Sequence, residues 1–102
     1  MDHLYLNNIE AIIDLQGRGY DHDFVISDEH IICVQEGQTI CPDEFEVIEA
    51  YRFEGKKKLC DNCVIYAIRS FNYDLSGILM TSYRRLTIGV SIHLWSKLAT
   101  NL

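Results

Sequence analysis

Residues 45–53 read Phe-Glu-Val-Ile-Glu-Ala-Tyr-Arg-Phe, and this stretch decides the class of fold that the sequence predicts. Large apolar side chains recur at odd positions, and charged side chains fall between them. A period of two is typical of a β-strand that packs one face and leaves the other in water. The residues expected on the packed face are Phe45, Val47, Tyr51 and Phe53.

Four further stretches are short, rich in β-branched and aromatic residues, and bounded by turn residues. They cover residues 24–27, 31–34, 63–70 and 77–83. The connectors are too short for parallel crossovers, so we expect neighbouring strands to be antiparallel. The sequence therefore predicts a meander sheet of about five strands.

Both ends of the chain show helical periodicity instead. From residue 6 to about residue 16, isoleucine and leucine recur at helical spacing, while Glu10 and Asp14 take the opposite side. Residues 88–102 form a second amphipathic segment. The predicted fold is α+β, with an N-terminal helix, an antiparallel meander sheet and a C-terminal helix in a single domain over residues 1–102.

Composition limits the partners that the chain can bind. Fifteen acidic residues stand against nine basic ones, which gives a formal net charge of −6. This charge repels phosphate backbones and anionic lipid, so we expect no nucleic-acid partner and no membrane partner. No stretch approaches the ~20 apolar residues of a membrane span, and the first residues lack a secretion signal. We therefore expect a cytoplasmic protein.

The four cysteines are Cys33, Cys41, Cys60 and Cys63, and we expect them to be reduced. The Cys60-x-x-Cys63 spacing can hold a zinc ion or form a redox pair, with three lysines just before it to favour the thiolate. Cys33 and Cys41 lack a second tight spacing, and the pair does not open a helix after a parallel strand. The pattern favours a hairpin loop with one exposed thiol. We expect no metal and no cofactor, with Cys60 and Cys63 as the candidate ligands if a metal binds.

Acidic residues form a second cluster around the decisive stretch. Carboxylates can pair for acid–base chemistry or hold magnesium. Their alternation with apolar residues favours the solvated face of a strand instead. The residues of this cluster are Asp43, Glu44, Glu46, Glu49 and Glu54.

Four segments carry a resemblance to a known family. They are Arg-Gly-Tyr at 18–20 with Asp-Phe after it, Pro-Asp-Glu-Phe-Glu-Val at 42–47, Tyr-Arg-Phe-Glu-Gly at 51–55 and Val-Ile-Tyr-Ala-Ile at 64–68. In these segments the chain resembles a family of small α+β proteins from Bacteroidetes, over roughly residues 6–83. Members carry the name phosphoribosylpyrophosphate synthetase, so the resemblance implies ribose-phosphate diphosphokinase activity, without catalytic residues to map onto this chain. After residue 83 the sequence departs from the family pattern.

The residues themselves disfavour that reaction. Diphosphoryl transfer from ATP needs a loop of backbone amides around the phosphates, and the sequence has no glycine-rich phosphate loop. Arg84 and Arg85 are adjacent, so in a strand they point to opposite faces and do not converge on one anion. We expect no synthesis of phosphoribosylpyrophosphate.

Two classes of function remain open. The first, which the missing catalytic motifs favour, is a non-catalytic interaction or regulatory module that uses a sheet edge or face. The second is a small ligand-binding domain or enzyme with a pocket between helix and sheet. Its polar contacts would come from Tyr20, Tyr51, Tyr66 and Tyr83.

The C-terminal segment also predicts a homodimer. Its apolar arc is wider than the ~100° stripe with which a helix lies on one core. An open sheet has two edges that a second chain can cover. We therefore expect pairing through the C-terminal helix or a sheet edge, and the apolar arc includes Leu94, Trp95, Leu98 and Leu102.

Overall fold

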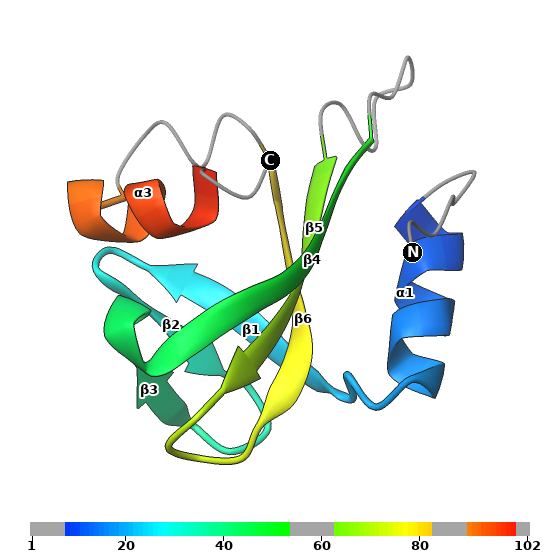
Figure 1. The fold of residues 1–102 in the computed structure, drawn as a ribbon, viewed down its shortest axis with the longest axis horizontal. Helices are drawn as coiled ribbons and strands as arrows, with labels where there is room; N and C mark the ends of the chain where they lie inside the picture. Colours follow the sequence, from blue (N-terminus) through cyan, green and yellow to red (C-terminus); the bar gives the residue numbers. More distant parts are fainter. Residues whose placement is uncertain (1–7, 54–62, 83–89, 100–102) are drawn as a thin grey trace.

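A computed structural model of the chain describes residues 8–53, 63–82 and 90–99 (Figure 1). The helices are α1 (Asn8–Gly17), the 3-10 helix η1 (Pro42–Glu44) and α3 (Ile92–Ala99). The strands are β1 (His22–Ser27), β2 (His30–Cys33), β3 (Gln38–Ile40), β4 (Phe45–Phe53), β5 (Cys63–Ser70) and β6 (Ser76–Ser82). The predicted α+β class, with a sheet between an N-terminal and a C-terminal helix, is confirmed.

The six strands form one mixed sheet in the order β3-β2-β1-β6-β5-β4. The pairs β1–β2, β2–β3, β4–β5 and β5–β6, which are consecutive in sequence, are antiparallel, as the length of their connectors predicts. β1 and β6 pair in parallel, and the other four strands lie between them in sequence. The sequence also missed β3, which has only three residues and continues the β2 hairpin.

The link between β3 and β4 forces the sheet to curl. These strands lie at opposite edges, five strand spacings of about 4.8 Å apart, or about 24 Å in a flat sheet. Only η1 and one flanking residue join them, and the five steps from Ile40 to Phe45 span at most about 18 Å. The two edges must therefore approach each other, and one face of the sheet becomes concave.

The concave face holds the larger hydrophobic cluster, to which all six strands and α3 contribute. The buried members are Phe24, Ile31, Cys33, Ile40, Phe45, Val64, Tyr66, Ile68, Leu75, Leu79, Leu94 and Leu98. α3 lies on this side of the sheet, and the Tyr66 hydroxyl donates a hydrogen bond to the Leu98 carbonyl over 3.1 Å (Figure 1). Leu94 and Leu98 therefore belong to the core of the monomer.

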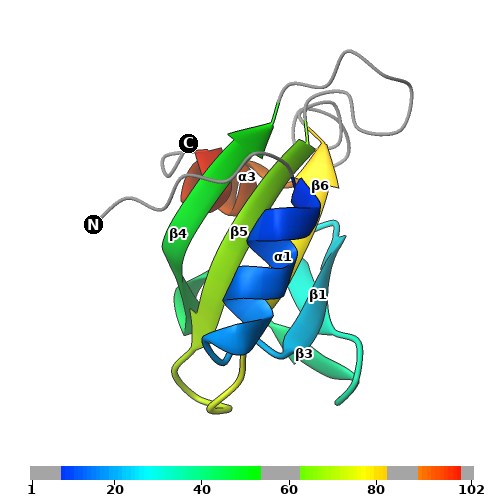
Figure 2. The same ribbon diagram turned by 90° about the vertical axis from the view of Figure 1, so that its right-hand side faces the viewer.

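The convex face carries α1 and the smaller cluster. Ala11 and Leu15 of α1 are fully buried against β5 and β6, where they meet Ile65, Ala67 and Ile78. Figure 2 shows α1 lying across β5 and β6, with β1 beside it. One helix thus covers the middle of the convex face.

A β-bulge in β4 corrects the expected packed face of residues 45–53. The register with β5 shifts between Val47 and Glu49, so that Ile48 is an extra residue. Phe45 and Val47 belong to the concave cluster, whereas Tyr51 and Phe53 pack against the convex one. The strict alternation was therefore wrong beyond Val47, because one inserted residue moves every later side chain to the other face.

Gly77 allows β1 and β6 to approach each other. A Cβ atom built on Gly77 would overlap the His22 carbonyl oxygen and lie 2.8 Å from the Phe24 ring. Backbone contacts of this kind cannot relax as a flexible side chain can, so only glycine fits the parallel pair at this position.

We expect Gly77→Ala to lower the free energy of unfolding by roughly 2–3 kcal/mol, because the added methyl group pushes β1 away from β6. Urea denaturation followed by circular dichroism measures the change. Gly17→Ala is the matched control, since no heavy atom lies within 4 Å of its built Cβ. It should leave stability unchanged or raise it by up to about 1 kcal/mol. Equal stability of the two variants would contradict the close approach at Gly77.

Candidate functional site

A polar network joins the end of α1 to β4 on the convex side. The Arg18 guanidinium donates two hydrogen bonds to the Glu49 carboxylate, over 2.6 and 2.8 Å, and a third to Asp14 over 3.1 Å. The Tyr51 hydroxyl also donates to Glu49. The bulge places Glu49 and Tyr51 on the face toward α1, so the network fixes the helix on the sheet.

Tyr20 lies close to this network. Burial raises the pKa of its hydroxyl above the usual range, the Glu49 charge raises it further, and Arg18 and Arg69 oppose the rise. A phenol with a raised pKa stays protonated at neutral pH, which suits a structural hydrogen-bonding group better than a general base. The network therefore has a structural role, which is to hold the end of α1 against β4.

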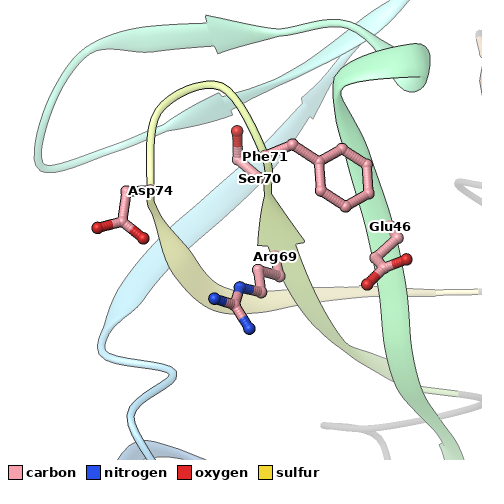
Figure 3. A pocket seen from close by; sticks show the side chains of 5 residues that line it. All are labelled: Glu46, Arg69, Ser70, Phe71 and Asp74. Atoms are coloured by element: carbon pink, nitrogen blue, oxygen red, sulfur yellow. The ribbon is translucent and has the colours of Figure 1, made fainter.

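The turn between β5 and β6 borders a hollow of about 270 Å³, lined by Glu46, Arg69, Ser70, Phe71 and Asp74 (Figure 3). In Figure 3 the Arg69 guanidinium lies between the two carboxylates, and the adjacent Ser70 points the other way. The Ser70 hydroxyl is buried and has no hydrogen-bond partner within the described structure. One cation between two carboxylates, beside an inaccessible hydroxyl, does not present convergent groups to an anion.

A second hollow, of about 360 Å³, lies where α3 meets η1. Apart from Pro42, the residues that line it are polar or titratable: Glu29, His30, Cys41, Asp43, Ser91 and His93. His93 Nε2 lies 3.1 Å from Asp43 Oδ1. A thiol, an imidazole and a carboxylate in one hollow are the parts of a nucleophilic site, so the state of the thiol decides its chemistry.

The Cys41 thiol is poorly suited to nucleophilic attack. Desolvation, then the hydrogen bond to Glu44 and the charge of that carboxylate, raise the pKa of the thiol above its usual range. The thiolate is the nucleophile, so a raised pKa leaves less of it at neutral pH. Glu44 is committed elsewhere, because it caps η1 by accepting from the Cys41 amide over 2.9 Å and binds the Asn72 amide.

The structure separates the other cysteines. Cys33 is buried in the concave cluster, and Cys63 is buried at the start of β5. Cys60 lies outside the described residues, so the expected loop at 60–63 stays a prediction. Within residues 8–53, 63–82 and 90–99, no group of three or more His, Cys, Asp or Glu side chains is placed to hold a metal ion.

The tyrosines expected to line one pocket do not share one in the described parts of the chain. Tyr66 is buried on the concave face, whereas Tyr20 and Tyr51 pack on the convex face. Tyr83, Glu54 and the arginines at 84 and 85 lie outside the described residues.

The uncovered part of the convex face carries a row of apolar side chains across three neighbouring strands. Met80 is opposite Ile65 of the convex cluster, so it points to the α1 side. Val25 points the same way, because Asp23 is opposite Ile78 and Val25 lies two residues further. Val25 is paired with Ile32 of β2. Val25 and Met80 are 47% and 50% exposed, so this row is open to solvent.

The flank of α1 continues this apolar surface. Arg18, just after α1, faces β4, and Ile12 lies on the other side of the buried line of Ala11 and Leu15, with Ile9 turned further toward solvent. Ile12 packs partly on the convex cluster, while Ile9 is 64% exposed. We call the surface of Ile9, Ile12, Val25, Ile32 and Met80 the open face.

The acidic residues of this part of the chain are spread over several sites. Residues 19–51, which include β1, β2 and β3, contain nine acidic residues and no lysine or arginine. Asp23 is on the same side of β1 as Val25, whereas Glu29, in the turn after β1, lines the hollow with Cys41 and His93. Neither the open face nor its charge could be recognised from sequence patterns alone, since both depend on which strands α1 covers.

Comparisons with family models, curated proteins and solved structures found no match to this chain. The resemblance of residues 6–83 to the Bacteroidetes family therefore stays a prediction. The described helices include none that is long and apolar enough to cross a membrane.

We expect Cys41 to react slowly with iodoacetamide at pH 8, and Glu44→Gln to speed the reaction several-fold. The variant removes the charge that favours the protonated thiol and keeps an oxygen that can accept from the Cys41 amide. Mass spectrometry of the Cys41 peptide gives the rate. Glu36→Gln, which removes a carboxylate that does not act on this thiol, should react as the wild type does. Equal rates in all three proteins would show that Glu44 does not control the thiol.

Proposed function

We propose that the chain is a non-catalytic, cytoplasmic interaction or regulatory module. The observation that supports this proposal is the open face, where apolar side chains of three strands and one helix flank stay in solvent. Exposed apolar surface of this kind is typical of protein-interaction sites. The two hollows give less support to a small-molecule site, since one presents opposed charges and the other a thiol whose pKa is raised by desolvation and by Glu44.

A homodimer is the second part of the proposal. Leu94 and Leu98 are buried in the monomer, so they do not supply a dimer surface. Ile92 and Trp95, which lie three residues apart on one face of α3, are 83% and 44% exposed. A self-complementary patch around these two residues suffices for a symmetric pair.

Light scattering after size exclusion should give about twice the 11.8 kDa mass of one chain at tens of micromolar. Trp95→Ala should restore the mass of the monomer, because it removes the largest apolar contact of the patch. Phe71→Ala alters another exposed aromatic side chain, on the β5–β6 turn, and should leave the dimer intact. A wild-type mass of one chain would rule out the dimer.

The purified chain should not convert ATP and ribose 5-phosphate into phosphoribosylpyrophosphate and AMP. This expectation rests on the missing glycine-rich loop, since phosphoryl chemistry depends on groups that position the phosphates. Release of AMP, measured against a reaction without protein, tests it. Ribose-dependent turnover that Arg84→Ala abolishes would establish the activity that the family name implies.

A further inference from the structure

We propose that the Glu44 carboxylate is an acid-sensitive latch. When it is ionised it holds the turn between β5 and β6 on η1, and when it is protonated it releases the tip of this turn. This inference concerns a different part of the molecule from the open face and does not depend on the proposed interaction function.

The latch joins two segments that are distant in sequence. η1 precedes β4, whereas residues 71–75 form the turn between β5 and β6. The Asn72 side-chain amide donates a hydrogen bond to Glu44 Oε2 over 2.9 Å, and the Tyr73 hydroxyl donates to the same oxygen over 3.4 Å. Glu44 therefore connects the tip of this turn to the short link through η1.

The other carboxylate oxygen is bound on the η1 side. Glu44 Oε1 accepts a hydrogen bond from the Cys41 amide over 2.9 Å, and the Cys41 thiol also donates to this carboxylate. Four donors thus converge on one side chain. Hydrogen bonds to an ionised carboxylate are stronger than those between neutral groups, so the strength of the whole set depends on the charge of Glu44.

The same contacts lower the pKa of Glu44 below its usual range. The largest cause is the hydrogen bond from the Cys41 amide, the one from the Asn72 amide comes next, and desolvation opposes them. A carboxyl group with a lowered pKa stabilises the folded state above its unfolded pKa. This stabilisation is lost as the pH falls through the folded pKa. The latch is therefore closed at neutral pH and opens in acid.

Protonation changes what the carboxyl group binds. One oxygen becomes a donor, which conflicts with the amide and hydroxyl donors around it. The remaining acceptor is neutral and holds its donors more weakly. The turn keeps the backbone hydrogen bonds at its base, from Phe71 N to Glu44 O and from Ser70 N to Leu75 O, while its tip is released.

Other titratable groups around the latch belong to η1, α3 and the two neighbouring turns. The thiol and the phenol that donate to Glu44 both have a raised pKa, so they are protonated at neutral pH and below. The charged groups on the α3 side of η1 form one hollow or contact its neighbours, so acid effects on them appear at α3. These titratable groups are Glu29, Cys41, Asp43, Tyr73, His93 and Lys97.

The latch also affects the hollow beside Arg69. The turn supplies Phe71 and Asp74 to its lining, so release of the tip alters the shape of this hollow (Figure 3). Asp74 has a φ of 52°, a conformation that is uncommon for residues other than glycine. Contacts outside the turn, such as those to Glu44, therefore help to keep the turn in place.

A pH titration of the 15N,13C-labelled chain from about pH 7 to about pH 2, followed by NMR, tests the latch. The Glu44 Cδ shift reports protonation of the carboxylate. Amide signals of residues 71–73, with the side-chain amide of Asn72, report the turn, and amide signals of α1 and β5 report global unfolding. We expect the turn signals to change with the Glu44 midpoint while those of α1 and β5 stay in place.

Variants of the donors test the hydrogen bonds themselves. Asn72→Ala should raise the Glu44 midpoint, because it removes a hydrogen bond that lowers the pKa of this carboxyl group. Tyr73→Phe should raise it less, since the hydroxyl lies 3.4 Å from Oε2. Gln38→Ala is the control, because this amide binds the Thr39 carbonyl, and it should leave the midpoint unchanged. Glu44→Gln should show the released turn signals already at neutral pH, because its own amide group faces the Asn72 amide.

Three results would overturn the inference. Turn signals that stay in place while Glu44 titrates would show that the carboxylate does not hold the turn. A Glu44 midpoint that Asn72→Ala leaves unchanged would show that the hydrogen bond is not made in solution. Signals of α1 and β5 that change at the same midpoint would show that acid unfolds the whole chain instead.

Discussion

The short link through η1 is the constraint on which the rest of this structure depends. It joins the two edge strands of a six-stranded sheet with too little chain to cross a flat one, so the sheet must curl. Curling makes one face of the sheet concave and the other convex, and each face has its own hydrophobic cluster. Among the described elements, α3 completes the core of the concave face and α1 covers the convex face over β5 and β6. The open face is the part of the convex side that α1 leaves exposed.

Local patterns in the sequence were sufficient for most of the elements. Runs such as residues 63–70 contain enough β-branched and aromatic side chains to identify a buried strand, and the helical spacing of leucine and isoleucine identified both helices. The features that were missed depend on contacts distant in sequence. The bulge at Ile48 looks like ordinary alternation until β5 is placed beside it, and the parallel pair of β1 and β6 joins strands that short-connector rules do not relate. β3 is too short for any period to be visible.

The candidate site was harder to predict than the fold, for a related reason. Each residue of the open face is an ordinary strand or helix residue, and Val25 and Met80 could equally have been buried had α1 lain over β1. Sequence reasoning instead selected groups with intrinsic chemistry, such as cysteines and carboxylates. In the structure several of these groups are far apart and make structural contacts: Cys33 is buried in the core, Glu44 caps η1, and Glu49 binds Arg18. Chemical reactivity is a property of side chains, whereas an interaction surface is a property of their arrangement.

The distribution of charge links the open face to the polar network on the other flank of α1. Arg18 is the one lysine or arginine in the first 51 residues, and its guanidinium is held by Glu49 and Asp14. Because these contacts turn Arg18 toward β4, the helix fixes its own cation on the side away from β1. Asp23, the one acidic residue of β1, therefore lies on the same face as Val25 without an opposing cation from α1. The apolar side chains of an interaction surface supply affinity, whereas the charges beside them decide which partners are attracted and which are repelled.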